Sequence, residues 1–166
     1  MKLTKEEKEW LLLPKALPIK SHFKNPRMWM GKENWDKVRK EVYKRAKYLC
    51  ELCGGKGYKH PVEAHEMWIF NLKTLEQVLL RFVALCPSCH RIQHMGLAAI
   101  HTHEGKLNPI RLASHFNRLR NTQFSYSEIN VISSDVFHKL NKHEFKIVLD
   151  KCNDPLFDIR MVENEI

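Results

Sequence analysis

The sequence predicts an α+β fold built around a small metal-held centre, with helical extensions at both ends. Two Cys-x2-Cys pairs, Cys50/Cys53 and Cys86/Cys89, are typical of the closed four-thiolate shell of a structural zinc ion. A β-prone stretch lies between the pairs, and apolar residues at helical spacing lie on either side of them. The 32 residues between Cys53 and Cys86 exceed the spacing of a simple zinc ribbon, so we expect them to form a folded unit.

Residues 1–33 form a predicted basic arm. Residues 1–49 carry 14 Lys and Arg against 6 Asp and Glu, whereas residues 140–166 carry 4 against 6. This concentration of positive charge favours a polyanion partner, because binding releases counterions from phosphates, although a merely solvated basic face has the same composition. Prolines at positions 14, 18 and 26 exclude a long helix, so we expect only a short one near residues 5–13.

A longer helix is predicted over residues 35–47, with Asn34 as its N-cap and Asp36 in its first turn. Apolar residues at spacings of three and four predict one buried face, made of Trp35, Val38, Val42 and Ala46. The opposite face is basic and is expected either to contact nucleic-acid phosphates or to be simply solvated. Its members are Lys37, Arg39, Lys40, Lys44 and Arg45.

The segments around the second cysteine pair have mixed patterns. Residues 60–70 are β-prone and partly alternating, which predicts a strand. Residues 72–86 have the composition of a short apolar helix or an extended loop. A further helix is expected from about Pro87, with Gly96 interrupting or ending it.

The C-terminal extension, residues 106–166, carries little recognisable chemistry. A helix is predicted over residues 109–119, with an apolar face made of Ile110, Leu112, Ala113 and Phe116. Residues 145–150 are a strand candidate. Cys152 lies far from the other cysteines and is expected to be a small buried hydrophobic residue.

Three histidines make a second predicted metal site. His90 and His94 follow the second cysteine pair at positions i and i+4 of the predicted helix, so both can face one ion. His65 lies in the segment that the zinc site folds back toward them. Three protein ligands with open positions describe a catalytic metal. The other histidines are expected at the surface (His22, His115, His138, His143), at a turn before Pro61 (His60), or as alternative ligands (His101, His103).

The segments "CELCGG", "VEAHEMW" and "LCPSCHRIQH" together resemble the HNH endonuclease family, specifically its zinc-containing ββα-metal members. The similarity covers roughly residues 34–97, and we assign residues 34–105 to an HNH nuclease core. The resemblance implies a β-hairpin followed by a helix that together hold one divalent ion beside a scissile phosphate. It also implies metal ligation by His65, His90 and His94.

Two positions depart from the family pattern. Glu66 takes the place of the histidine that activates water, and Arg81 takes the place of an asparagine that braces the loop. Glu66 can still serve as the general base, although an ordinary glutamate has a lower pKa than a histidine. The alternatives are that Glu66 orients a neighbouring group, or that His65 is the base and Ala64 takes the ligand position.

We therefore expect a metal-dependent HNH DNA endonuclease, a hydrolase of phosphodiester bonds with His65 and Glu66 as catalytic residues. Its cofactors would be a structural Zn²⁺ and one catalytic cation, Mg²⁺, Mn²⁺, Ni²⁺ or Zn²⁺. Arg91 and the basic helix would contact DNA; a monomer would nick it, and a homodimer could cut both strands. The alternatives are a zinc-stabilised nucleic-acid-binding module with a decayed HNH centre and a zinc-framed protein-interaction module.

The composition also bears on the cellular location. The first residues do not have the pattern of a secretory signal, and no apolar run approaches the roughly 20 residues that span a bilayer. We expect a cytoplasmic protein, of cellular or phage origin, without membrane contact. In a reducing compartment, five cysteines favour metal binding over disulfides.

Overall fold

The computed structural model describes residues 2–21 and 25–162, which form an α+β structure with a small sheet. In chain order the α-helices and strands are α1 (Lys5–Leu11), α2 (Pro26–Trp29), α3 (Gly31–Arg45), β1 (Glu63–Asn71), β2 (Glu76–Leu85), α4 (Pro87–Gln93), α5 (Met95–His103), α6 (Pro109–Arg120), α7 (Tyr126–Asn141) and β3 (Lys146–Val148). Short 3-10 turns cover Ile19–Ser21 and Ile159–Met161.

The sheet is a long antiparallel hairpin with one short added strand. β1 and β2 pair with His65 opposite Val83, and β3 runs parallel to the beginning of β2. The hairpin turns at Asn71, whose side-chain oxygen accepts hydrogen bonds from the backbone N–H groups of Lys73 and Thr74. The helix α4 follows β2 directly, so the central part of the chain has the order hairpin, then helix.

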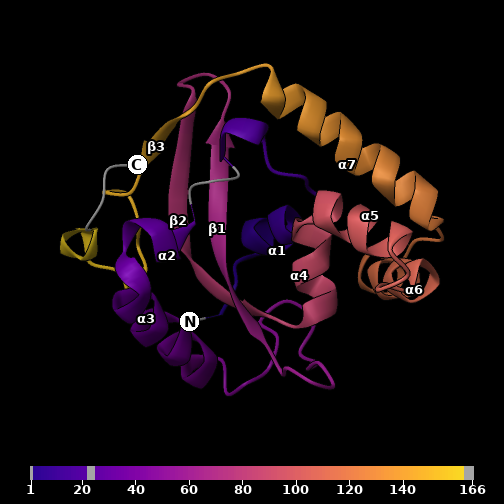
Figure 1. Ribbon diagram of the computed structural model, residues 1–166, viewed down its shortest axis with the longest axis horizontal. Helices are drawn as coiled ribbons and strands as arrows, with labels where there is room; N and C mark the ends of the chain where they lie inside the picture. Colours follow the sequence, from indigo (N-terminus) through magenta and orange to yellow (C-terminus); the bar gives the residue numbers. More distant parts are fainter. Residues whose placement is uncertain (1, 22–24, 163–166) are drawn as a thin grey trace.

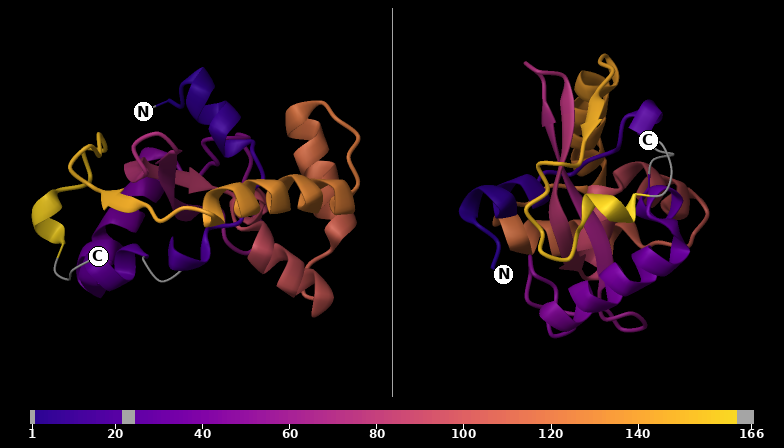
Figure 2. Two further views of the ribbon diagram at one scale, coloured as in Figure 1. Left: turned by 90° about the horizontal axis from the view of Figure 1, so that it is seen from above. Right: turned by 90° about the vertical axis from the view of Figure 1, so that its left-hand side faces the viewer.

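Helices cover both sides of the hairpin (Figure 1): α2 and α3 lie on one side, and α1, α4, α5, α6 and α7 lie on the other. The apolar face of α3 packs on the sheet, with Trp35 and Phe82 rings 5.7 Å apart. A second apolar cluster joins α4, α5, α6 and α7, where α7 runs crosswise to α6 and also contacts α5 (Figure 2, left). The hairpin and α4 therefore meet between two packed layers.

The predicted N-terminal arm packs closely on the rest of the molecule within its described residues. Leu11 is completely buried, and Leu3 is nearly so. Trp10 donates its indole N–H to the carbonyl oxygen of Trp68 in β1 at 2.7 Å. Thr4 and Glu7 form a capping box that begins α1 close to where the sequence predicted the short helix.

The prediction for residues 72–86 was wrong, because most of this segment is the strand β2. Its leucines and glutamate have good helix propensity, but the preceding strand offers a complete row of backbone partners. Residues from Phe82 to Leu85 are all fully buried, as expected for a strand covered on both faces. Tertiary pairing therefore decided this element.

Two helix boundaries also differ from the predictions. The helix α3 begins at Gly31, so Asn34 lies inside it and its side-chain amide donates to the carbonyl of Met30 at 3.1 Å. The break after α4 falls at His94, whose backbone leaves the helical region (φ −128°, ψ 52°), whereas Gly96 lies within α5. The break thus lies at one of the histidines of the predicted metal site.

The described part of the C-terminal extension contains more secondary structure than the sequence predicted. The helix α7 was not predicted, although Ser125 and Glu128 form a capping box at its beginning. The predicted helix over residues 109–119 and the strand candidate are present as α6 and β3. Ile110 is exposed, contrary to its predicted place on the apolar face, and Cys152 is half-buried beside the core.

Candidate metal centres and the adjoining cavity

The four paired cysteines form one compact cluster. Cys50, Cys53, Cys86 and Cys89 each offer a sulfur atom, and all four atoms lie within 4.8 Å of one another. The sulfur atoms of Cys53 and Cys86 are 3.7 Å apart, close to the edge of a tetrahedron with bonds of about 2.3 Å to a central zinc ion. The pKa of the Cys89 thiol is raised by its three neighbours in the cluster, Cys50, Cys53 and Cys86. A divalent cation allows four such groups to be thiolates together, so the donor set fits a structural zinc.

A buried arginine braces the first cysteine loop. Arg81, in β2, is completely buried and donates to the carboxylate of Glu51 at 2.7 Å, with Glu7 of α1 3.6 Å away. The other oxygen of Glu51 accepts the backbone N–H of Ala84 at 2.7 Å. Since Glu51 lies between Cys50 and Cys53, this network fixes the loop relative to the hairpin.

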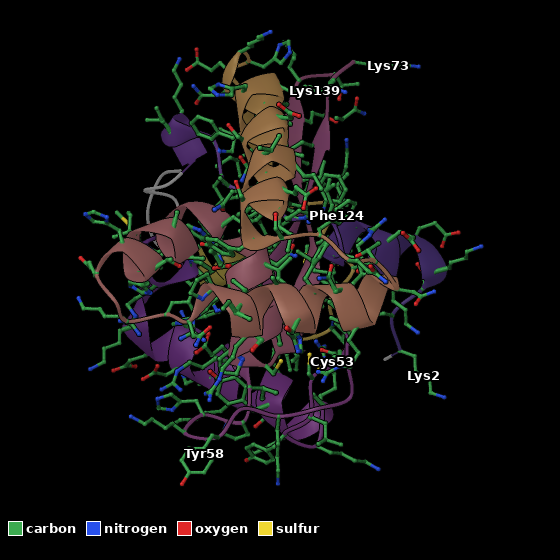
Figure 3. All side chains as sticks on the ribbon, turned by 90° about the vertical axis from the view of Figure 1, so that its right-hand side faces the viewer. Lys2, Cys53, Tyr58, Lys73, Phe124 and Lys139 are labelled. Atoms are coloured by element: carbon green, nitrogen blue, oxygen red, sulfur yellow. The ribbon has the colours of Figure 1, made fainter. Side chains whose placement is uncertain are left out.

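His115 was predicted at the surface but lies against the cysteine cluster. Its Nε2 is 3.1 Å from the sulfur of Cys89, and Figure 3 shows Cys53 beside α6, the helix that carries His115. The sulfur atoms of Cys53 and Cys86 raise the pKa of His115 to about 9 where no metal neutralises them. Arg118, which can only donate, lies 3.0 Å from Nδ1 and favours the neutral ring. Whether the His115 ring is protonated or neutral, its Nε2 carries a proton that it can donate to the sulfur of Cys89.

The three histidines of the second predicted site also converge. His65 from β1, His90 from α4 and His94 at the end of α4 each offer a nitrogen, and these atoms lie within 4.8 Å of one another. The Nε2 of His94 is 3.2 Å from the Nδ1 of His65. Two nitrogens bound to one ion at about 2.0–2.1 Å lie about 3 Å apart, so this group could hold a metal ion.

The environment keeps His65 ready to act as a ligand. His65 is buried, and burial lowers its pKa well below the usual value, helped by the positive charges of His94, His90 and Lys15. A neutral imidazole has a free lone pair, whereas an imidazolium cannot bind a cation. The ring is therefore in its metal-binding form at neutral pH.

Glu63 is a site residue that the sequence did not single out. Its carboxylate contacts the Nδ1 of His90, and this hydrogen bond lowers the pKa of Glu63. The contact leaves the Nε2 of His90 for a metal, which is the common carboxylate–histidine–metal arrangement. The position of Glu63 at the first residue of β1, two before His65, was the available signal.

Glu66 lies on the opposite side of β1 from His65, as strand alternation predicts. It lines a cavity together with His90 and His94. Although its surface is partly accessible, the surrounding atoms desolvate its carboxylate, and this desolvation raises the pKa of Glu66. The raised pKa moves Glu66 toward the range of a useful general base.

The N-terminal arm holds the helix break at His94. The backbone N–H of Lys15 donates to the carbonyl of Ile92 at 3.0 Å, and its carbonyl accepts the N–H of Met95 at 2.7 Å. The Lys15 amine donates to the side-chain oxygen of Gln93 at 2.7 Å, and the Gln93 amide donates to the carbonyl of Leu11. These bonds satisfy backbone groups that the break would otherwise leave unpaired.

A large cavity adjoins the three histidines. It has a volume of about 1100 Å³ and lies between β1, the arm, α5 and α7. His90, His94 and Glu66 form part of its wall, and most of the remaining wall is apolar. Pockets of this kind, with few polar groups beside a reactive centre, are typical of ligand sites.

The predicted DNA-contacting residues fall into different environments. Lys37 and Lys40 are exposed on α3, and Lys44 is exposed but pairs with Glu41 at 2.6 Å. Arg45 is not part of the open basic face: its guanidinium bonds the buried carboxylate of Asp154 at 2.7 Å and the carbonyl of Phe82. Arg91 is half-buried.

The other histidines lie outside both clusters in the described part of the chain. His60, His103, His138 and His143 are exposed, and His101 is half-buried. His22, which was expected at the surface, lies outside the described residues.

None of the described helices combines the length and apolar character needed to cross a bilayer. Comparisons with protein-family models, curated proteins and solved structures gave no match. The two clusters and the adjoining cavity are therefore the features from which a function can be inferred.

Proposed function

We propose that this chain is a metal-dependent endonuclease of the HNH type that hydrolyses phosphodiester bonds in DNA. One observation carries the proposal: His65, His90 and His94 converge, with His90 and His94 lining a cavity, while a separate four-cysteine cluster can hold the structural zinc. A closed thiolate shell and an open three-imidazole group are suited to different tasks. The order of hairpin and helix around them agrees with the ββα-metal core that the sequence resembles.

The three histidines would hold the catalytic ion through the Nδ1 of His65 and the Nε2 atoms of His90 and His94. When bound, a divalent ion supplies a Lewis acid that polarises a phosphoryl oxygen and makes water more acidic. Glu63 keeps His90 in the orientation that directs Nε2 toward the other two rings. Burial keeps His65 neutral and available.

Glu66 would act as the general base from the cavity side. Its carboxylate shares the cavity wall with His90 and His94, and desolvation raises its pKa. A base with a raised pKa takes a proton from water more readily at neutral pH. The exposed Lys37 and Lys40 would contact DNA phosphates without reading sequence.

The test is cleavage of supercoiled plasmid by protein that retains zinc but has been stripped of the second metal. We expect cleavage after addition of Mg²⁺, Mn²⁺, Ni²⁺ or Zn²⁺, and a loss of about 100-fold or more in His65→Ala and Glu66→Gln. His138→Ala, on the exposed face of α7, is the control. Full activity in Glu66→Gln would exclude Glu66 as the base.

A second candidate is a zinc-stabilised nucleic-acid-binding module with a decayed HNH centre. Two observations favour it: Glu66 replaces the usual histidine, and Arg81 serves a structural network in place of the usual asparagine. In this case the intact protein would bind DNA in a salt-sensitive manner, cleave with none of the ions, and be unaffected by His65→Ala.

A further inference from the structure

The residues that line the cavity beside the three histidines are not of the kind that binds a phosphate backbone. Among its described lining residues, none is a lysine or an arginine. The arm, β1, α5 and α7 contribute apolar wall residues, with α5 and α7 on the same side of the hairpin as α4 (Figure 1). They include Ala16, Leu17, Trp68, Leu97, Ile100 and Phe137. The cavity therefore suits a flat or apolar group better than an anion.

The position of the cavity restricts what can enter it. His90 and His94 line it and also contact His65, with ring centroids 5.2 and 5.0 Å from the His65 ring. A phosphate held at these histidines lies at the edge of the cavity. The nucleoside attached to that phosphate is then the nearest group able to occupy the cavity.

The cavity also offers hydrogen-bonding groups on one side. Asn130, Ser133 and Ser134 of α7 line it, opposite the β1 residues Glu66 and Trp68. Amide and hydroxyl groups can both donate and accept hydrogen bonds, as the edge of a nucleobase does. Aromatic side chains such as Trp68 and Phe137 provide surfaces on which a base can stack.

We propose that the cavity binds an unstacked nucleobase next to the scissile phosphate, so that the substrate is single-stranded or locally unpaired nucleic acid. This inference rests on the proposed nuclease function. In a fully paired duplex both faces of each base are covered by neighbouring bases, and extrusion costs free energy. The cost is smallest where the base is mispaired or already in a single strand.

The experiment compares kcat/KM for one labelled sequence presented as a single strand, as a duplex with a central mismatch, and as a perfect duplex. Ser134→Trp fills the cavity from α7, and Ala99→Trp fills it from α5; both positions are exposed and line the cavity. Val131→Trp is the matched control, because Val131 is exposed on α7 but is not a lining residue. Zinc content and thermal melting check that each variant is folded.

We expect the intact protein and Val131→Trp to cleave the single strand and the mismatched duplex at least tenfold faster than the perfect duplex. Both cavity-filling variants should lose about tenfold or more on the single strand, because the base no longer stacks. Equal rates in the filled variants and the control, or a preference for the perfect duplex, would overturn the inference. Absence of cleavage by the intact protein with every ion would instead overturn the proposed function, and this inference with it.

Discussion

Lys15 places a buried amine against oxygens that carry no full charge. Its Nζ donates to the side chain of Gln93 and the carbonyl of Trp10, and it lies 4.4 Å from the centre of the Trp10 ring. Burial lowers the pKa of Lys15 to about 7. The ring face favours the ammonium form, but desolvation outweighs it.

This shift predicts a pH-dependent stability. Between about pH 7 and the ordinary lysine pKa of 10.5, the unfolded chain binds a proton at Lys15 that the folded chain does not. The free energy of unfolding should therefore rise with pH in this window, by up to about 1.4 kcal/mol per pH unit for one proton.

Urea unfolding of the intact protein and of Lys15→Met at pH 7, 8 and 9 measures this contribution. Methionine keeps a similar volume and does not titrate, so the difference between the two proteins isolates Lys15. The free energy of unfolding of the intact protein should increase relative to that of the variant at each increase in pH. A difference that stays constant with pH would mean that the amine keeps an ordinary pKa.

A second residue-scale prediction concerns His115. If its Nε2–H donates to the sulfur of Cys89, His115→Ala removes a charge-assisted hydrogen bond from a zinc-bound thiolate. We expect zinc to transfer to a chromogenic chelator about tenfold faster from this variant than from the intact protein. His138→Ala, an exposed histidine on α7, should release zinc at the original rate. Equal rates in both variants would assign His115 to packing alone.

At the scale of elements, a set of hydrogen bonds that we call the strap links the N-terminal arm to α4 and so to the three histidines; it joins Lys15 to Ile92, Gln93 and Met95, and Gln93 to Leu11. Gln93 lies one residue before the helix break and is buried. Its side chain forms hydrogen bonds with both the Lys15 amine and the carbonyl of Leu11. The break gives His94 a non-helical backbone, and the ring still reaches His65. The orientation of His94 therefore depends on a segment far away in sequence.

Gln93→Leu should weaken metal binding at the proposed three-histidine site and leave zinc binding at the four-cysteine site unchanged. The change leaves the Leu11 carbonyl and the Lys15 amine each short of one partner, at a cost of about 1–3 kcal/mol per group. Calorimetric titration with Ni²⁺, together with zinc analysis, checks this. Gln123→Leu, at an exposed position, is the control. Unchanged Ni²⁺ affinity in Gln93→Leu would mean that the strap does not position His94.

At the scale of the whole molecule, the basic charge is distributed over surfaces with different tasks. The exposed Lys37 and Lys40 are free to meet a polyanion, whereas Arg45 stabilises the fold through the buried Asp154. Lys37 and Lys40 thus differ in role from Arg45, although the sequence placed all three on one face of the same helix, α3.

These roles predict different effects on DNA binding. The double variant Lys37→Ala/Lys40→Ala should bind DNA more weakly, with a slope of log affinity against log salt smaller by about 1 for each phosphate that the variant no longer neutralises. Arg45→Ala should keep its salt slope but lose about 3 kcal/mol of stability, because Asp154 is left as a buried unpaired charge. Fluorescence anisotropy between 50 and 200 mM salt, without added divalent ion, and urea unfolding distinguish the two. An unchanged slope in the double variant would place the DNA surface elsewhere.

The sequence by itself determined the parts of this protein that depend on short-range spacing. The cysteine pairs, the histidines around them and the basic face of α3 are visible as patterns, because ligand geometry and helical periodicity impose fixed intervals. The helices α3 and α6 were predicted from their apolar faces, whereas α1 was expected as the short helix that the prolines allow. The capping box that begins α7 was also present in the sequence, but it was not used.

Only the tertiary structure decided features that depend on partners far along the chain. The strand β2 formed in a helix-prone segment because β1 supplied its backbone hydrogen bonds. Arg45, Arg81 and His115 make specific contacts with Asp154, Glu51 and Cys89, respectively. The arm fixed the break at His94 through Lys15. Long-range hydrogen bonds and buried charges of this kind have no sequence period, so the fold alone brings their partners together.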